Sequence, residues 1–208
     1  MANDAIVHVV DDDVDVRHSL SFLLATAGLP VRLHESASAF LSAVKEPPSG
    51  CILTDVRMPG IDGIELLRRL RARGFSVPVI VMTGHADVPL AVEAMKQGAA
   101  DFIEKPFDDD LLVAAIRSAL AAHGRAAEQA QQAAAVQARF ASLSERERQV
   151  LAALVAGKPN KVIAHDLGIS PRTVEIYRAN VMSKMEAGSL SELVRMALQI
   201  GDAAIGAA

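Results

Sequence analysis

The first half of the sequence alternates short apolar runs with amphipathic stretches, and this alternation limits the possible folds more than any other feature. Five runs are typical of buried parallel strands: 6–10, 31–35, 51–55, 77–83 and 100–105. Between them, Leu20, Leu23 and Leu24 share one helical face that ends at Gly28, and Asp62 lies where a helix cap is expected. Strands that alternate with helices favour right-handed βαβ crossovers. We therefore predict a three-layer α/β domain over residues 1–124.

The second half has a different pattern. In segment 125–141, Ala and Gln fill 12 of 17 positions without Gly or Pro, which favours a helical linker, with disorder as the alternative. Residues 142–208 contain no strand-like run. Ser144 with Glu147 forms a capping box, and Ser170 precedes a proline at a helix start, with Gly168 between two short helices. Two short helices around a tight turn are typical of a helix-turn-helix, so we predict a small four-helix domain.

Charge divides the chain in the same way. Residues 1–124 carry a net charge of −6 and residues 125–208 one of +2, which indicates two modules with different partners. The single Cys51 excludes an intramolecular disulfide framework and fits a reducing compartment. The longest stretch without Asp, Glu, Lys or Arg has 14 residues, fewer than the roughly 18 of a membrane span, and no export signal is visible. We expect a cytoplasmic protein without a membrane partner.

Carboxylates gather at the ends of the predicted strands. Asp11 and Asp12 follow the first strand, Asp55 ends the third, and Thr83 and Lys105 end the fourth and fifth. In an open parallel sheet these ends share one edge, where ligands bind. Converging carboxylates repel each other unless a cation lies among them, and oxygen ligands suit Mg²⁺. A carboxylate is also a nucleophile toward phosphorus, so this edge is a candidate phosphoryl-transfer site.

The helix that begins at Pro171 has two faces. Val174, Tyr177, Val181 and Met185 fall on one side and should pack against the preceding helices. The other side and its flanks are suited to the major groove of DNA and consist of Arg172, Thr173, Glu175, Ile176, Arg178, Ala179 and Asn180. Arg172 suits guanine and Glu175 suits the cytosine amino group. The candidates for phosphate contacts are Lys158, Lys161, Arg178 and Lys184. For each charged residue, the alternative is an ordinary solvated surface.

Four motifs of the first half resemble the receiver domain of two-component response regulators: VVDD (9–12), LTDVRMPGIDG (53–63), VMTGHAD (81–87) and GAADFIEKPF (98–107). The resemblance implies a flavodoxin-like doubly wound sheet with strand order 2-1-3-4-5. It implies that Asp55 is the phosphoacceptor and Asp12 a direct Mg²⁺ ligand. Asp11 would act through metal-bound water, and the backbone carbonyl of Arg57 would complete the metal site.

The same resemblance assigns the remaining positions of this site. Thr83 matches the switch hydroxyl, Phe102 the switch aromatic and Lys105 the phosphate-binding lysine. The phosphoryl group would come from a phosphohistidine of a sensor histidine kinase. His85 and Arg57 flank the phosphorylation pocket at positions that vary among receivers, and we hypothesise that they set the dephosphorylation rate. Movement of Thr83 and Phe102 would remodel a dimer face with the candidate contacts Val88, Leu90, Val92 and Lys96. The alternative is that these apolar residues only pack against the sheet.

Residues 143–185 are similar to the effector domain of the LuxR/NarL class, with Asn180 standing where many relatives carry Arg. Together, the two halves look like the FixJ-type response regulators. This resemblance implies a homodimer, formed on phosphorylation, that binds double-stranded promoter DNA and activates RNA polymerase. The expected targets are nitrogen-fixation or oxygen-responsive genes.

Two other classes of function compete with this interpretation. An aspartate-based phosphatase or phosphotransferase would use the same carboxylates, but the second half adds no substrate-binding signature. A sigma-like subunit would explain the helix-turn-helix, but the chain shows no other polymerase-binding region. We therefore expect a transcriptional regulator and not an enzyme.

Overall fold

The computed structural model describes residues 5–84 and 88–201, and the chain divides into two compact units, 1–125 and 126–208. The strands of the first unit are β1 (Ile6–Val10), β2 (Val31–His34), β3 (Gly50–Asp55), β4 (Val79–Thr83) and β5 (Asp101–Glu104). Its helices are α1 (Val14–Thr26), α2 (Ala37–Ala43), α3 (Gly63–Ala72), α4 (Val88–Lys96) and the first part of α5 (Asp109–Ala141). The second unit contains the end of α5, α6 (Glu145–Val155), α7 (Asn160–Leu167), α8 (Pro171–Lys184) and α9 (Leu190–Ile200). No described helix is long and apolar enough to cross a membrane.

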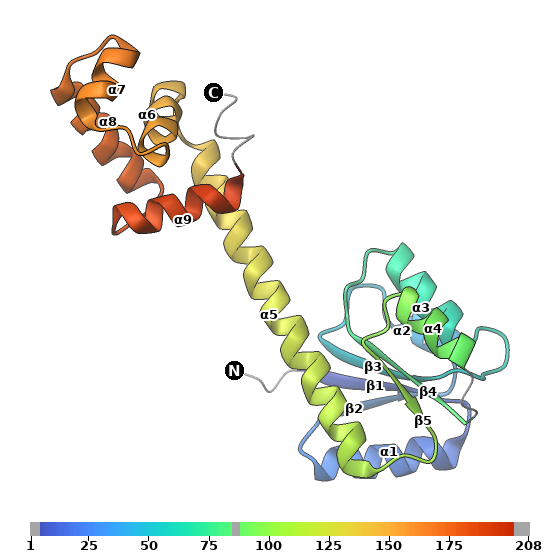
Figure 1. Ribbon diagram of the computed structural model, residues 1–208. Helices are drawn as coiled ribbons and strands as arrows, with labels where there is room; N and C mark the ends of the chain where they lie inside the picture. Colours follow the sequence, from blue (N-terminus) through green and yellow to red (C-terminus); the bar gives the residue numbers. More distant parts are fainter. Residues whose placement is uncertain (1–4, 85–87, 202–208) are drawn as a thin grey trace. The chain divides into compact units, whose positions relative to one another are not determined.

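The five strands form one parallel sheet in the order β2-β1-β3-β4-β5, which confirms the predicted topology. Both faces of this sheet are covered, α2, α3 and α4 lying on one side and α1 and α5 on the other (Figure 1). Because the inner strands β1, β3 and β4 are buried on both faces, the crossover helices can bury an apolar stripe against either side of the sheet. The order changes direction at β1 and β3, so the crevice for a ligand lies beyond their carboxyl ends.

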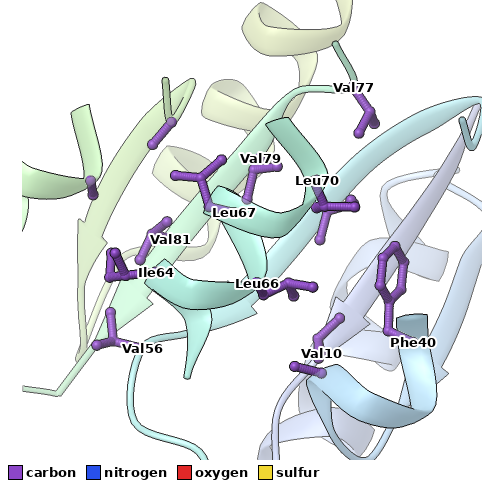
Figure 2. Close-up of a cluster of buried hydrophobic side chains, with 14 of the residues drawn as sticks. Val10, Phe40, Val56, Ile64, Leu66, Leu67, Leu70, Val77, Val79 and Val81 are labelled. Atoms are coloured by element: carbon purple, nitrogen blue, oxygen red, sulfur yellow. The ribbon is translucent and has the colours of Figure 1, made fainter. Parts of the chain in front are cut away.

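Two apolar cores, one on each face, hold the layers of the first unit together. Figure 2 shows the core under α2 and α3, where Phe40, Leu66 and Leu67 pack on Val10, Val79 and Val81 of the sheet. The opposite core joins Leu24 of α1 and Ile116 of α5 to the other face. Cys51 of β3 belongs to this second core, and burial raises the pKa of its thiol to about 12. The thiol therefore stays protonated and packs as a small apolar group.

Two histidines lie buried beside each other on β1 and β2. His8 Nδ1 lies 3.0 Å from His34 Nε2, and the two rings stack, with Phe40 edge-on to both. Burial lowers the pKa of His8 to about 4, and the neighbouring charges of His34 and Arg32 act in the same direction. Burial and Arg32 also lower the pKa of His34. Both rings are therefore neutral at pH 7, and one donates a hydrogen bond to the other.

Side-chain caps begin α6 and α8 of the second unit at the predicted residues. Ser144 and Glu147 form a reciprocal capping box at the start of α6, and the Ser170 hydroxyl accepts from the backbone N–H of Thr173 at the start of α8. Between α7 and α8, Gly168 adopts a left-handed conformation with φ 64°, which a residue with a side chain rarely adopts. These local contacts produce the short turn of the helix-turn-helix.

The core of the second unit includes residues that the sequence placed in the linker. Segment 125–141 is helical as part of α5, but Val136 and Phe140 are buried against Val150, Leu151 and Leu193. The guanidinium of Arg148 also lies over the Phe140 ring, 5.5 Å from its centroid. The last turns of α5 are thus part of the helical domain, and the exposed stretch of this segment ends at residue 135. The periodicity of an Ala-rich helix does not reveal which of its turns meets another helix.

Candidate phosphoryl-transfer site and DNA-facing helix

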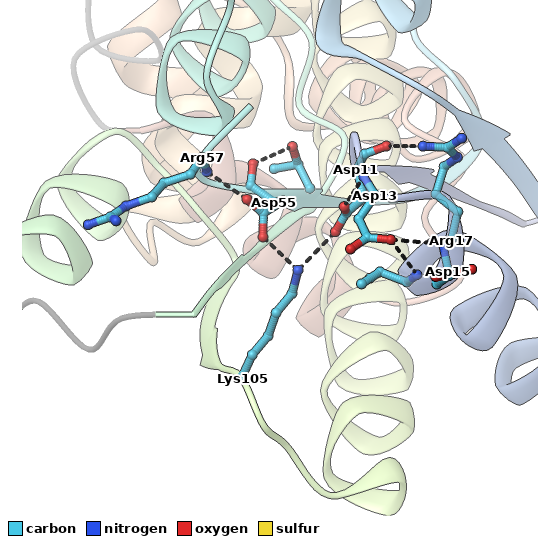
Figure 3. A network of polar contacts seen from close by, with 9 residues as sticks. Asp11, Asp13, Asp15, Arg17, Asp55, Arg57 and Lys105 are labelled. Atoms are coloured by element: carbon cyan, nitrogen blue, oxygen red, sulfur yellow. Dashed lines mark hydrogen bonds and ion pairs between the residues drawn. The ribbon is translucent and has the colours of Figure 1, made fainter. Parts of the chain in front are cut away.

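Three charged side chains from three strand ends meet at the carboxyl edge of the sheet. Asp11 follows β1, Asp55 ends β3 and Lys105 follows β5. Lys105 Nζ donates to Asp55 Oδ1 at 2.6 Å and to Asp11 Oδ2 at 2.9 Å, as Figure 3 shows. The side chain of Asp11 is 2% exposed and that of Asp55 is 10% exposed. The sheet topology therefore brings together residues that lie 50 and 94 positions apart in the sequence.

Asp11 is held in place by the start of α1. Its Oδ1 accepts from the backbone N–H of Asp13, and Asp13 in turn caps α1 by accepting from Asp15 and Val16. Arg17, one helical turn further on, donates from Nη1 to the backbone carbonyl of Asp11 at 2.7 Å (Figure 3). Sequence reasoning missed this role of Arg17, because the contact is set by how α1 leaves the sheet.

Asp55 is positioned by the loop between β3 and α3. Its Oδ2 accepts from the backbone N–H of Arg57 at 2.6 Å. The loop then folds back so closely that a Cβ atom on Gly63 would lie 2.2 Å from the carbonyl oxygen of Asp55. Only glycine fits there, and Asp62 caps α3 immediately before it. One carboxylate oxygen of Asp55 thus accepts from the Lys105 side chain, and the other accepts from the backbone N–H of Arg57.

The electrostatics of this edge keep Lys105 charged. Burial lowers the pKa of Lys105, but hydrogen bonds to Asp55 and Asp11 together with their negative charges outweigh burial, and the net pKa is raised. The ammonium therefore supplies a fixed positive charge between two buried carboxylates. A group that brings several negative oxygens to Asp55 would meet this charge at once.

Thr83 and Phe102 leave the sheet on the same face. Phe102 pairs with Val81, and Thr83 is the residue two places further along β4; side chains two residues apart on a strand point the same way. Thr83 is buried, whereas Phe102 is partly buried against the core under α3 and α4. The two side chains therefore lie on the α4 side of the sheet, with Thr83 at the level of the strand end where Asp55 lies.

The donor atoms at this edge suit a hard cation, but the predicted metal ligands are only partly assembled. Asp11 and Asp55 converge on Lys105, whereas Asp12 is exposed beside them. In the part of the chain that the structure describes, no group of three His, Cys, Asp or Glu side chains is arranged to hold a metal ion. The carboxylate oxygens of this edge are the kind of donor that Mg²⁺ prefers, and Mg²⁺ keeps several waters and takes only one or two carboxylates. His85 lies outside the described residues.

The candidate dimer residues lie on α4. Val88 and Val92 are 75% and 45% exposed, Lys96 is exposed, and Leu90 is partly buried against the core. Met95, which sequence reasoning missed, is 50% exposed and lines a shallow hollow with Ala91, Val92 and Lys96. The helical periodicity of this segment separates an exposed face of α4 from a buried one, and this separation is the signal that could have found Met95. Leu90 belongs instead to the side that packs on the sheet.

Helix α8 of the second unit shows the two predicted faces. Val174, Val181 and Met185 are fully buried and Tyr177 is half-buried, which confirms the side that packs against the other helices. The opposite side is open to solvent and presents Arg172, Glu175, Ile176, Ala179 and Asn180, with the half-buried Thr173 and Arg178 on its flanks. Ile176 is 56% exposed, an apolar side chain that suits a thymine methyl group.

The lysines predicted to contact phosphates differ in their surroundings. Lys158 Nζ pairs with Asp166 at 2.8 Å, both side chains being well exposed. Lys184 Nζ pairs with Glu147 at 2.7 Å, and the Glu147 side chain is only 5% exposed. Lys161 is exposed and forms no ion pair with another described residue. Among the three lysines, Lys184 is the one bound to another helix, α6, and the sequence pattern gives no sign of this contact.

Comparisons with known proteins identify the family of each unit. Residues 7–117 match the family of response regulator receiver domains, and residues 141–197 match the bacterial regulatory proteins of the luxR family. The chain is 65% identical over 198 residues to the transcriptional regulatory protein FixJ of Azorhizobium caulinodans, covering 94% of this chain and 92% of that protein. It is 55% identical to FixJ of Bradyrhizobium diazoefficiens, over 97% and 98% of the two chains.

Two solved structures match the chain over nearly its full length. Full-length FixJ from B. japonicum matches with a TM-score of 0.62 at 55% identity, over 96% of this chain and 98% of that one. The response regulator StyR matches with a TM-score of 0.81 at 40% identity, over 94% and 99%. The chain therefore belongs to the two-component response regulators that join a receiver to a LuxR-type DNA-binding domain. Within that class, it is a member of the FixJ-type transcriptional regulators.

Proposed function

We propose that this regulator accepts a phosphoryl group on Asp55 from the phosphohistidine of a sensor histidine kinase. One observation carries the proposal: Lys105 bridges Asp55 and Asp11 at hydrogen-bond distance at the open edge of the sheet. A carboxylate oxygen of Asp55 attacks phosphorus, an O–P bond forms, the P–N bond to the imidazole breaks, and the imidazole leaves with that electron pair. Lys105 binds the phosphoryl oxygens as negative charge gathers on them.

Mg²⁺ is the proposed cofactor of this step. Asp12 and Asp55 would hold it, with Asp11 acting through a bound water and Arg57 through its backbone carbonyl. When bound, the ion neutralises phosphoryl charge. The residues of the chain do the rest: the Arg57 N–H orients the Asp55 carboxylate, and Arg17 and Asp13 hold Asp11 in place. Arg57 and His85 remain the proposed determinants of the dephosphorylation rate.

Phosphorylation would act through the pair Thr83 and Phe102. A phosphoryl group adds a charge of about −1.5 to −2 and three acceptor oxygens. The Thr83 hydroxyl moves to donate to one of them, and Phe102 takes up the space it leaves, on the side of the sheet that α4 covers. This exchange between two packed arrangements changes the face of α4. The proposed homodimer then forms through Val88, Val92 and Lys96, with Leu90 supporting them from below.

The proposed output is binding of double-stranded promoter DNA by α8 and activation of RNA polymerase. The base edges are read by five residues of α8: Arg172, Glu175, Ile176, Ala179 and Asn180. The sugar-phosphate backbone of the DNA is contacted by Thr173, Arg178, Lys158 and Lys161. Pairing two second units matters because a module with a charge of +2 makes few phosphate contacts, and two linked half-sites multiply the affinity.

We further propose that the protein works in the cytoplasm, that it does not turn over small phosphoesters as an enzyme, and that it controls nitrogen-fixation or oxygen-responsive genes. The FixJ relatives support the last point.

We also propose a three-part division of the chain into receiver (1–124), linker (125–141) and DNA-binding domain (142–208), except that the last turns of α5 pack with the DNA-binding domain.

The test is intact-mass spectrometry with Mg²⁺ and a small acyl phosphate, with molar mass in solution measured on the same samples. The wild-type chain should gain one phosphoryl group and dimerise, whereas Asp55→Asn should do neither. Asp15→Asn is the matched control, because Asp15 is an exposed carboxylate near the same edge; it should behave as wild type. Phosphorylation of Asp55→Asn, or a wild-type dimer without phosphate, would refute the proposal.

A further inference from the structure

Lys184 lies on the helix proposed to face DNA, yet its half-exposed ammonium is bound by a buried carboxylate of another helix. It is the last residue of α8, and its Nζ donates to Glu147 Oε2 at 2.7 Å. Glu147 belongs to the first turn of α6, and the same Oε2 accepts from the backbone N–H of Ser144 at 2.7 Å. One buried carboxylate therefore closes the cap of α6 and holds the end of α8.

The positions of Glu147 and Lys184 in their helices stabilise the ion pair between them. Glu147 lies in the first turn of α6 and Lys184 in the last turn of α8, the positions where a negative and a positive side chain stabilise the helix dipoles. Burial raises the pKa of Glu147, but the hydrogen bonds from Lys184 and Ser144 and the charge of Lys184 outweigh it, so the net pKa is lowered. Removing Lys184 from this carboxylate would leave a buried charge without its partner.

We infer that Lys184 is a positioning residue and not a phosphate contact: its ion pair with Glu147 fixes the C-terminal end of α8 on α6 and so sets the direction of the DNA-facing side. The neighbouring residues support this role, because Val181 and Met185 of the same helix end are fully buried in the core. The apolar contacts set how deeply α8 packs, and the ion pair restrains its rotation and tilt. The inference rests on the proposed reading of bases by α8.

Lys161 offers a matched comparison. It is a lysine of the same domain, exposed on α7, with no ion pair to another described residue. A contact with a DNA phosphate releases counterions when it forms. Its loss therefore reduces the slope of log affinity against log salt concentration by about 0.9. A positioning residue leaves that dependence unchanged and alters the preference for one sequence over another.

The experiment uses the full chain and a duplex selected from a random pool by the phosphorylated wild type, with a scrambled duplex as reference. The variants are Lys184→Met, Lys184→Arg, Glu147→Gln and Lys161→Met. Folding of the second unit is followed by tyrosine fluorescence, because Tyr177 of α8 is the single tyrosine and the sequence has no tryptophan. Binding is measured at a temperature at which this signal shows every variant to be folded.

For Lys184→Met, we expect the melting temperature of the second unit to fall by roughly 5–15 °C, the selected-to-scrambled affinity ratio to fall about tenfold, and the salt slope to stay unchanged. Lys184→Arg should restore the ratio, and Glu147→Gln, which keeps a capping oxygen, should reproduce the loss. Lys161→Met should make the salt slope shallower with the ratio and the melting temperature unchanged.

Two results would overturn the inference. A shallower salt slope for Lys184→Met with an unchanged ratio would make Lys184 a phosphate contact. A lower melting temperature with both binding quantities unchanged would make the pair a purely structural one. Failure of the underlying proposal is a separate result, because then the wild-type chain itself would select no duplex.

Discussion

The two units use buried charge for different ends. In the first unit, Asp11, Asp55 and Lys105 converge from three strand ends and form the proposed phosphoryl-transfer site. In the second, Glu147 and Lys184 converge from the ends of two helices, while the side chains proposed to meet DNA are exposed on α8. A parallel sheet gathers distant side chains at one edge by its topology. A small helical domain presents its functional residues on one helix and must hold the direction of that helix.

The largest expected effect tests where the second unit begins. Phe140→Ala removes a buried ring from the core of the second unit and should lower its free energy of unfolding by about 3–5 kcal/mol. Tyr177 fluorescence in denaturant measures this unit alone. Gln129→Ala, on the exposed part of the same helix, should change nothing. Equal, small effects of the two substitutions would place the whole of segment 125–141 outside the domain.

The second prediction separates the units by pH. Because the pKa of His8 falls to about 4 in the folded state, the unfolded chain binds a proton between pH 6.5 and 4 that the folded chain does not. The free energy of unfolding of the first unit is therefore highest above pH 6.5. It falls by on the order of 3 kcal/mol as the pH falls toward 4. The lowered pKa of His34 adds to the loss.

The second unit should respond only in stronger acid. The pKa of Glu147 lies below its usual 4.5, so its contribution to stability is present above pH 4.5 and is lost as the pH falls through the lower, folded value. At about pH 5, hydrogen exchange of β1 and β2 should therefore increase, while the Tyr177 signal stays constant. Replacing both histidines together (His8→Leu with His34→Leu) should flatten the response of the first unit. Simultaneous loss of both units near pH 5 would contradict this order.

The third prediction concerns the reactive charges. Lys105→Met leaves Asp55 in place but removes the cation that faces the incoming phosphoryl oxygens, so phosphorylation by a small acyl phosphate should slow about a hundredfold or more. The rate is read from the mass shift over time. Lys45→Met, at an exposed lysine near the end of α2, serves as the control. If both variants react at the wild-type rate, the ion pairs of this edge are structural only.

The smallest expected effect tests the start of α8, the helix proposed to face DNA. Ser170→Ala removes the hydroxyl that accepts from the Thr173 N–H at 3.1 Å and should lower the stability of the second unit by about 1 kcal/mol. Tyr177 fluorescence again provides the measurement, and Ser170→Asp, which can also cap, should retain most of the stability. An alanine variant as stable as wild type would show that core packing alone determines where α8 begins.

The sequence predicted the order of strands and helices, the capping residues of α6 and α8, and the edge where Asp11, Asp55 and Lys105 meet. These features depend on contacts three or four residues apart, or on the rule that parallel strands align their carboxyl ends. The pattern of α8 also separated its buried side from its exposed side, because helical periodicity is a local property.

Only the tertiary structure decided how distant elements meet. It showed that Lys184 is bound by Glu147, that Arg17 holds the carbonyl of Asp11, and that Phe140 belongs to the core of the second unit. It also left Asp12 exposed beside the two carboxylates that join Lys105. The physical reason is that periodicity and caps are set by the backbone within a few residues, whereas the partner of a long side chain depends on the relative position of packed elements, to which no local pattern is sensitive.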